Sequence, residues 1–284
     1  MRTSSSNRFF QMAAVFTGLT GACMAQAPDG SAAAQAAQPM TPRQHGPMQF
    51  LGRAKDNSVS STNWSGYAVT GTSFTQALGS WIVPEVSCKI LSTTYSAFWV
   101  GIDGYTSGTV EQTGTESDCD GIRPRYYAWY EFYPAASILI SSVPVAPGNI
   151  MSASVTYDGT EFTVTITNVT TGQSYSTSSA VPGAQASSAE WIAEAPCCTL
   201  LGGILPLSNF GIASFGPFPP GEPGTGVITT NFAADVSTPL GPINVFPSSS
   251  IEQINMATRL GAVEATTSAP LAQDGSFYVT WASQ

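Results

Sequence analysis

Two glutamates lie four residues apart in the apolar stretch AEWIAEAPCC, residues 189–198, although only 10% of this chain is charged. The stretch has the composition of a β-strand, in which successive side chains alternate between the two faces of a sheet. Glu190 and Glu194 are therefore expected on one face and Trp191 on the other. Four strand residues span about 13 Å, so we interpret Glu194 as the candidate for acid–base chemistry and Glu190 as a structural or supporting residue.

A third carboxylate lies among aromatic residues in YYAWYEFYP, which begins at Tyr126. Strand alternation places Trp129, Glu131 and Tyr133 on one face and the aromatic residues between them on the other. A strand with large side chains on both faces is either buried on both sides or lines a cleft. Glu131 is thus a second candidate for carboxylate chemistry.

The scarcity of histidine excludes most hydrolytic mechanisms that use an imidazole. The only histidine, His45, lies in a polar N-terminal segment, whereas Ser-His-Asp and Cys-His mechanisms need an imidazole as base. No aspartate lies in an Asp-Thr-Gly or Asp-Ser-Gly loop of the kind that aspartic proteases pair. Carboxylates are what remains for acid–base chemistry.

The elements that must position these residues are β-strands. In TYDGTEFTVTITNVTTGQSYS, the apolar residues Phe162, Val164 and Ile166 alternate with threonines, and Asp-Gly and Thr-Gly pairs supply turns on either side. The same pattern predicts strands at 95–100, 126–133, 227–232 and 277–281, and no segment has a helical period with caps. Many short strands, with 27 glycines and 20 prolines between them, predict an all-β fold, an antiparallel sandwich of two sheets.

The N-terminus has the layout of a secretory signal peptide. Arg2 and Arg8 precede an apolar stretch, and small residues follow it. We expect residues 1–27 to be removed by cleavage near Ala25 or Ala27, which makes the protein secreted. After removal of the signal peptide, no membrane attachment is expected.

Residues 28–57 differ in composition from the rest of the chain. They are rich in Ala, Gln and Pro and lack hydrophobic periodicity, which predicts a leader that is disordered or lies on the surface. Residues 58–284 are predicted to form one domain.

Charge divides the chain at the same boundary. The domain 58–284 has a formal net charge of −12, whereas the leader carries Arg43, Arg53, Lys55 and His45. An acidic domain of this kind argues against nucleic-acid partners and suits low pH. Two interpretations of the leader stay open: a plug attracted to the acidic domain near neutral pH and released in acid, or a spacer.

Four cysteines, Cys88, Cys119, Cys197 and Cys198, lie in the expected domain. In an exported chain an even number predicts one or two disulfides. Cys88 and Cys119 could pair with each other or with the 197/198 couple. The cysteines lack C-x2-C spacing, so no metal site is predicted, and no cofactor is expected.

Six strings carry a specific resemblance. NWSGY, FWVGIDG, VEQTG, YYAWYEFYP, AEWIAEAP and PLSNFG, between residues 63 and 211, resemble in this order the motifs of the glutamic peptidases, or eqolisins. The resemblance implies a concanavalin-like or jelly-roll sandwich bent around a substrate groove. It also implies an endopeptidase that acts on polypeptides at acid pH, and we expect a monomer.

The resemblance places the catalytic glutamine at Gln112 and the catalytic glutamate at Glu194. Residues that line or support the family's groove correspond to Trp64, Trp99, Asp103, Trp129, Glu131 and Tyr133. Where fungal members tend to have an acid before AWYE, this chain has Tyr127.

A Gln/Glu pair suffices for peptide hydrolysis. A carboxylate with a reference pKa of about 4.3 can act as general base for water in mild acid. It can then return the proton to the leaving nitrogen, while the amide of Gln112 donates a hydrogen bond to the oxyanion. Two alternatives stay open: a glycoside hydrolase that uses Glu131 and Glu194, and a carbohydrate-binding module that does not need Gln112.

Overall fold

The computed structural model describes residues 42–197, 203–216, 233–238, 243–244, 251–268 and 276–283. These residues all fall in one compact unit, residues 40–284. The regular elements in the described ranges are all β-strands. In chain order they are β1 (Phe50–Arg53), β2 (Val59–Ser61), β3 (Trp64–Thr70), β4 (Phe74–Ile82), β5 (Thr93–Thr94), β6 (Ala97–Ile102), β7 (Val110–Asp120), β8 (Arg123–Tyr133), β9 (Ile138–Ile140), β10 (Ile150–Tyr157), β11 (Phe162–Asn168), β12 (Gln173–Ser179), β13 (Ser188–Glu194), β14 (Ile212–Gly216), β15 (Ala233–Val236), β16 (Ile243–Asn244), β17 (Ile251–Ala257), β18 (Val263–Thr267) and β19 (Phe277–Trp281).

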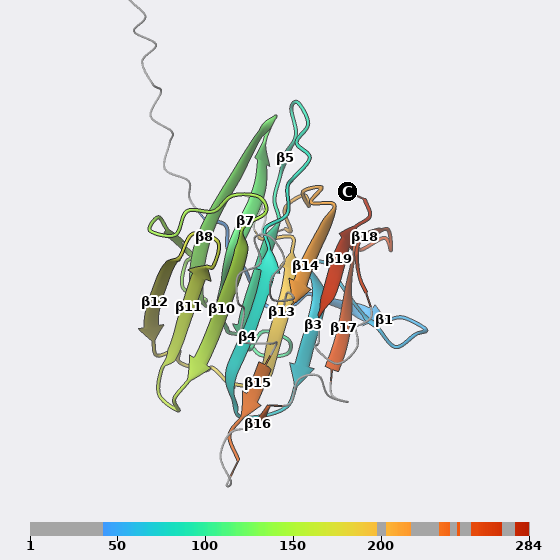
Figure 1. Cartoon of the computed structure of the whole chain (residues 1–284). Helices are drawn as coiled ribbons and strands as arrows, with labels where there is room; N and C mark the ends of the chain where they lie inside the picture. The colour runs from blue at the N-terminus through green and yellow to red at the C-terminus, as the bar shows by residue number, and fades with distance from the viewer. Residues whose placement is uncertain are drawn as a thin grey trace, which may run out of the picture. The chain divides into compact units, whose positions relative to one another are not determined.

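The strands form two layers (Figure 1). Hydrogen bonding orders one layer as β12-β11-β10-β4-β14-β19 and the other as β9-β8-β7-β6-β13-β3-β17. Strand β18 pairs with both β17 and β19 and so joins the layers along one edge. These pairings are antiparallel, β2 runs parallel to β17, and β4 and β10 pack against β6 and β7. The predicted antiparallel sandwich is confirmed.

Strand alternation sets which side chains fill the interior. Trp191 belongs to the large apolar cluster that contains residues of both layers, whereas Ile192 belongs to a second cluster with Trp64, Trp99 and Trp129. Fully burying one large apolar side chain contributes roughly 1.5–3 kcal/mol. The second cluster lies on the other face of β13, the face that carries Glu194.

Four of the strand segments predicted from alternation are present in the structure, as β6, β8, β11 and β19. The segment 227–232 lies outside the described residues. Turns at 158–159 and 171–172 separate β10, β11 and β12, and Gly159 and Gly172 have positive φ angles of 96° and 81°. Glycine is favoured there because it has no Cβ to clash.

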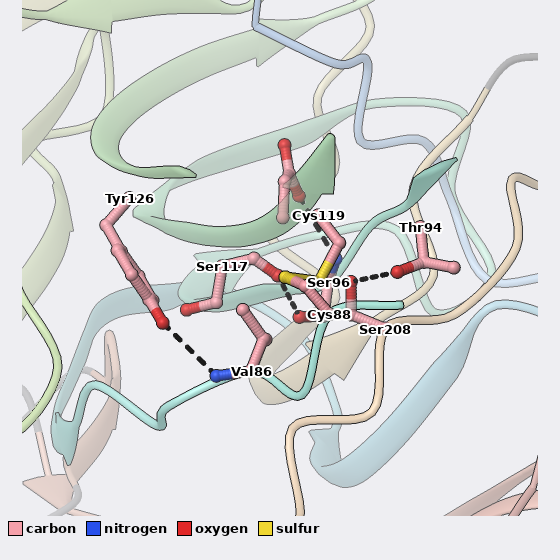
Figure 2. The surroundings of a disulfide bond; sticks show 9 residues. Val86, Cys88, Thr94, Ser96, Ser117, Cys119, Tyr126 and Ser208 are labelled. Carbon is pink, nitrogen blue, oxygen red and sulfur yellow. Dashed lines mark hydrogen bonds between the residues drawn. A yellow bond between two sulfur atoms is a disulfide. The ribbon is translucent and has the colours of Figure 1, made fainter. Parts of the chain in front are cut away.

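One disulfide joins Cys88, in the loop that follows β4, to Cys119 near the end of β7 (Figure 2). The main-chain N–H of Val86 donates to the hydroxyl of Tyr126 beside it. The cysteine spacing left the partner of Cys88 open, and the structure shows that this partner is Cys119. Cys197 is also disulfide-bonded, and Cys198 lies outside the described residues.

The described part of the leader, residues 42–57, packs against the domain, whereas the composition predicted a leader that is disordered or lies on the surface. It contains β1, which pairs with β2, and Arg53 makes two hydrogen bonds of 2.7 Å with the carboxylate of Glu252. His45 is fully buried. Composition did not reveal that His45 reaches distant strands.

The predicted signal peptide, residues 1–27, and the leader as far as Thr41 lie outside the described residues. Within the ranges that the structure describes, no helix is long and apolar enough to cross a membrane.

Strands β6 and β7 approach closely at Gly114, which pairs with Trp99. A Cβ at Gly114 would overlap the carbonyl oxygen of Phe98 and lie 2.5 Å from the Cβ of Trp99. Only glycine fits, and Gln112 lies two residues away on the same strand.

We therefore predict that Gly114→Ala lowers the free energy of unfolding by about 1–3 kcal/mol, the usual cost of overpacking a buried site. Gly108→Ala is the matched control, because a Cβ there meets no atom within 4 Å. Urea unfolding monitored by tryptophan fluorescence measures both variants. Equal stability of the two variants would contradict the argument.

Candidate active site

The register of three strands brings the candidate residues onto one face. Glu116 of β7 and Glu194 of β13 both pair with Ala97 of β6, and Gln112 and Glu190 both pair with Gly101. Residues an even number apart share a face, so β7 and β13 direct these acids and Gln112 to the same side. Gln112 and Glu194 thus lie on different strands of one sheet.

Strand β6 lies between β7 and β13. On the face that carries Trp99, its other residues are small: Ala97 and Gly101. A Cβ at Gly101 would lie 2.8 Å from the Trp99 ring and 3.3 Å from the Cβ of Gln112. Gly101 thus leaves room for the tryptophan ring and for the side chain of Gln112. Trp64 packs edge-on against Trp99, with ring centroids 5.0 Å apart.

Glu194 is fully buried and is held by two donors. The indole N–H of Trp99 donates to its Oε2 at 2.8 Å, and Nδ1 of His45 lies 3.2 Å from the same oxygen. Burial raises the pKa of Glu194 to about 7, against the lowering effect of the His45 and Trp99 contacts. Its Oε1 has no hydrogen-bond partner among the described residues.

Gln112 and Glu131 are neighbours across β7 and β8, and both contact the main chain of His45. The amide of Gln112 donates to the carbonyl oxygen of His45 at 2.6 Å. The carboxyl of Glu131 accepts from the N–H of His45 at 2.8 Å. Burial raises the pKa of Glu131 to about 9, so this group holds its proton at neutral pH.

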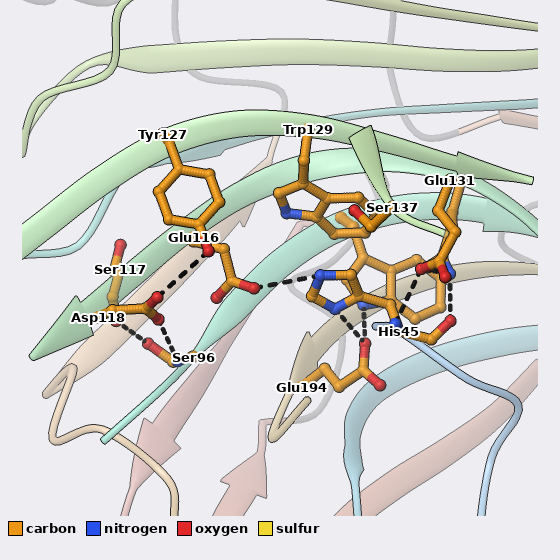
Figure 3. Close-up of polar contacts among 12 residues, drawn as sticks. His45, Ser96, Glu116, Ser117, Asp118, Tyr127, Trp129, Glu131, Ser137 and Glu194 are labelled. Carbon is orange, nitrogen blue, oxygen red and sulfur yellow. Dashed lines mark hydrogen bonds and ion pairs between the residues drawn. The ribbon is translucent and has the colours of Figure 1, made fainter. Parts of the chain in front are cut away.

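His45 lies at the centre of the site (Figure 3). Its ring stacks on Trp129, with centroids 3.7 Å apart and planes 9° apart. Its Nε2 lies 3.1 Å from Oε1 of Glu116, and its Nδ1 faces Glu194. Sequence reasoning assigned His45 to the leader and did not place it here, since no local pattern links the leader to β7 or β13.

Glu116 was also missed, although a signal for it exists. It lies four residues after Gln112, so strand alternation alone places both on the same face. Burial raises its pKa to about 8. The pKa of its neighbour Asp118 is raised by burial and by Glu116, and Asp118 accepts a hydrogen bond from the hydroxyl of Tyr127 at 3.3 Å. Tyr127 therefore supports this acid pair.

The remaining candidates support the site from further away. The carboxylate of Asp103 accepts hydrogen bonds from the N–H groups of residues 185, 186 and 187, immediately before β13. Glu190 is level with Gln112, because both residues pair with Gly101, and it lies four residues from Glu194 along β13. Burial raises the pKa of Glu190. Tyr133 lies beside Gly46, since a Cβ added to this glycine would be 3.6 Å from the tyrosine ring. Tyr133 therefore contacts the leader next to His45.

Comparison with known proteins gives consistent matches. The model of the peptidase A4 family matches residues 62–218. Aspergillopepsin-2 of Aspergillus niger is 34% identical over 163 residues, which are 49% of this chain and 57% of that protein. Scytalidopepsin B of Scytalidium lignicola is 38% identical over 127 residues, 44% of this chain and 46% of that protein. The chain thus spans about half the length of these curated relatives.

A structural match covers more of the chain. A scytalido-glutamic peptidase crystallised with a transition state analog inhibitor superposes with a TM-score of 0.61 and 23% identity, over 78% of this chain and 98% of that chain. At this identity the match establishes a shared fold.

The buried carboxyls predict a protein that is more stable in acid. The pKa values of Glu194, Glu116, Glu131 and Glu111 are raised to about 7, 8, 9 and 9, so the folded state binds protons more tightly than the unfolded state. The stability that they contribute is fully present below about pH 4.5 and is lost as pH rises through 7–9. Each group loses up to about 1.4 kcal/mol per pH unit in this window.

We expect Tm to fall steadily between pH 5 and pH 9, as measured by differential scanning calorimetry on a variant without proteolytic activity. Introducing Glu116→Gln into that protein should flatten the decline, because a neutral amide does not titrate. A Tm that rises over this range, or does not change, would show that the carboxyls are not held protonated.

Proposed function

This chain belongs to the peptidase A4 family, and from that premise we propose that it is an endopeptidase that hydrolyses peptide bonds of polypeptides at acid pH. The observation that carries the proposal is a peptide segment lying on the candidate residues. The carbonyl of His45 contacts Gln112, and its side chain contacts Glu194. Two residues from different strands thus converge on one residue of an extended segment.

In the proposed mechanism Glu194 is the general base. Its carboxylate takes a proton from water as the water oxygen bonds to the carbonyl carbon of the substrate. When the leader leaves, water regains access to Glu194, and the burial that raises its pKa is relieved. Its pKa then moves back toward the ordinary range, where a base for mildly acid solution is required.

Gln112 stabilises the charge that develops on the substrate carbonyl. Its amide does not titrate, so it donates a hydrogen bond at any pH, and such a donor is worth about a hundred- to a thousand-fold in rate. Glu194 then gives its proton to the nitrogen as the C–N bond breaks, releasing a carboxylic acid and an amine. Glu131 binds the N–H that precedes the cleaved bond, in the way that it binds the N–H of His45.

The pattern of donors and acceptors favours a peptide over a sugar. Glu131 and Gln112 engage the N–H and the C=O of one residue, which is the complementarity that an amide backbone offers. A glycoside hydrolase based on Glu131 and Glu194 gives Gln112 no role, and a binding module requires no Gln/Glu pair.

The proposed function includes the place where the protein acts. We propose a secreted monomer whose signal peptide, residues 1–27, is removed near Ala25 or Ala27, and which binds neither nucleic acid nor membranes. The acidic composition and the N-terminal pattern of the sequence support it.

Substitution of either residue of the pair should abolish proteolysis while the fold is retained. Glu194→Gln keeps the side-chain shape but removes the base, and Gln112→Ala should reduce kcat by at least about a hundredfold. Glu190→Gln is the matched control, because it changes the other acid of the same strand. Release of fragments from a denatured protein and of sugars from β-glucan, across pH 2 to 7, measures the activity.

Circular dichroism checks that each variant is folded. If Glu194→Gln or Gln112→Ala retained most of its activity, that residue would have no catalytic role. Release of sugars without release of peptides would replace the proposed function with the glycosidase alternative.

A further inference from the structure

The leader crosses the candidate site in an extended form that is held at both ends. Gln44 exchanges two main-chain hydrogen bonds with Cys197, of 3.2 and 2.9 Å. On the other side, the N–H of Met48 donates to the carbonyl of Gly104 at 2.9 Å, and the N–H of Gln49 donates to the side chain of Asn63 at 2.8 Å. Main-chain pairing of this kind is how extended peptides add to strand-based binding sites.

Between these anchors, the carbonyl of one peptide bond meets Gln112, and the side chain of the same residue meets Glu194. The carbonyl of His45, which belongs to the His45–Gly46 bond, accepts from Gln112 at 2.6 Å. This is the position that the oxygen of a cleaved bond must occupy if Gln112 stabilises the oxyanion. The N–H of the same residue is bound by Glu131.

The side chain of His45 fills a subsite that matches its shape and polarity. One face of the ring lies on Trp129, and the two ring nitrogens face Glu116 and Glu194 at 3.1 and 3.2 Å. Aromatic rings pack favourably on one another, and a buried carboxyl requires a polar partner. Leucine and other aliphatic side chains would leave Glu116 without this partner.

The position after the bond has different requirements. Gly46 lies against the ring of Tyr133, and an added Cβ would only reach ordinary contact, 3.6 Å from that ring. The site therefore accepts a small residue there.

We propose that residues 42–49 bind as a substrate, that the His45–Gly46 bond is the bond cut in self-processing, and that Glu116 and Trp129 select histidine before the cleaved bond. The proposal rests on the proposed peptidase function and extends it to a substrate class: peptides with His followed by a small residue. Hydrolysis of this bond adds one water and leaves a carboxylate on His45 and an amine on Gly46.

The same contacts explain how the bond can persist near neutral pH. While Nδ1 of His45 faces Oε2 of Glu194, that carboxylate is engaged and the imidazole occupies the space beside it. The titratable groups that face the ring are Glu116 from β7 and Glu194 from β13. Glu131 from β8 contacts the main-chain N–H of His45, and Arg43 on the leader lies against Tyr95. Release of the imidazole from Glu194 is what lets water reach that carboxylate.

Two of the three leader bases hold the segment elsewhere. The guanidinium of Arg43 lies 4.5 Å from the centroid of the Tyr95 ring and donates to its hydroxyl at 3.2 Å, whereas Arg53 pairs with Glu252. Since Arg53 lies outside the proposed subsite, it provides a matched control for His45.

The first test follows self-processing of the full chain after a shift from pH 7 to pH 3.5, by mass spectrometry and N-terminal sequencing. We expect a new N-terminus at Gly46, cleavage at this bond slowed at least tenfold by His45→Ala, and a rate within twofold of wild type for Arg53→Ala. A different N-terminus, no self-cleavage, or equal rates for the two variants would overturn the proposal.

The second test uses the acid-treated protein and two synthetic peptides, the leader sequence PRQHGPMQ and the same peptide with Leu in place of His. We expect kcat/KM to be at least about tenfold higher for the His peptide, and the ratio to fall to within twofold in Glu116→Gln. Because the ratio in the wild-type enzyme is itself decisive, a misfolded variant does not remove the test. Equal cleavage of both peptides would overturn the proposed subsite.

Failure of this inference is distinguishable from failure of the proposed function. A protein that degrades denatured protein in acid but lacks both the Gly46 terminus and the His preference retains the peptidase function and loses the inference. A protein that degrades neither peptides nor denatured protein loses both.

Discussion

The burial of several carboxyl groups on one face of a sheet is the constraint on which the site depends. Glu116, Glu131, Glu190 and Glu194 project from β7, β8 and β13 and are fully buried. An ionised carboxylate without a partner is costly in such surroundings, so each group must hold a proton or find a donor. The raised pKa values show that these groups tend to hold a proton. Glu194 also has hydrogen-bond partners, Trp99 and His45.

This constraint connects the fold to the leader. The sandwich brings acids from separate strands together, but the described part of the domain supplies few donors at the centre of the site. The leader supplies an imidazole with two nitrogens and a main-chain N–H within one residue. His45 contacts three carboxyl groups on three strands at once, which explains why an otherwise polar segment is buried there.

Local pattern was enough to predict the strands and their faces. The alternation of Trp191 with Ile192, and of Trp129 with Ala128, assigned each side chain to the correct cluster. Motif resemblance predicted Gln112 and Glu194 as candidates, and the strand register places both on one face. The pairing of Cys88 with Cys119 could not be chosen, because spacing alone does not say which loops meet.

The rest of the site depends on contacts that no local pattern encodes. Glu116 and Glu194 share a row only because β6 lies between β7 and β13 and both residues pair with Ala97. The charge of the leader drew attention to Arg43, Arg53 and Lys55, whereas the site uses His45, whose ring shape and position matter more than net charge. Composition described residues 42–57 as a polar leader and missed a contact 149 residues away along the chain.

The single imidazole also makes the stability of this chain depend on whether the leader is present. While His45 is in place, the acids of β7 and β13 have an imidazole partner. Once the residue is cut away, that partner is lost, and the acids that stay buried depend on their own protons. A processed molecule is therefore expected to lose more stability than the uncut chain as pH rises above neutrality.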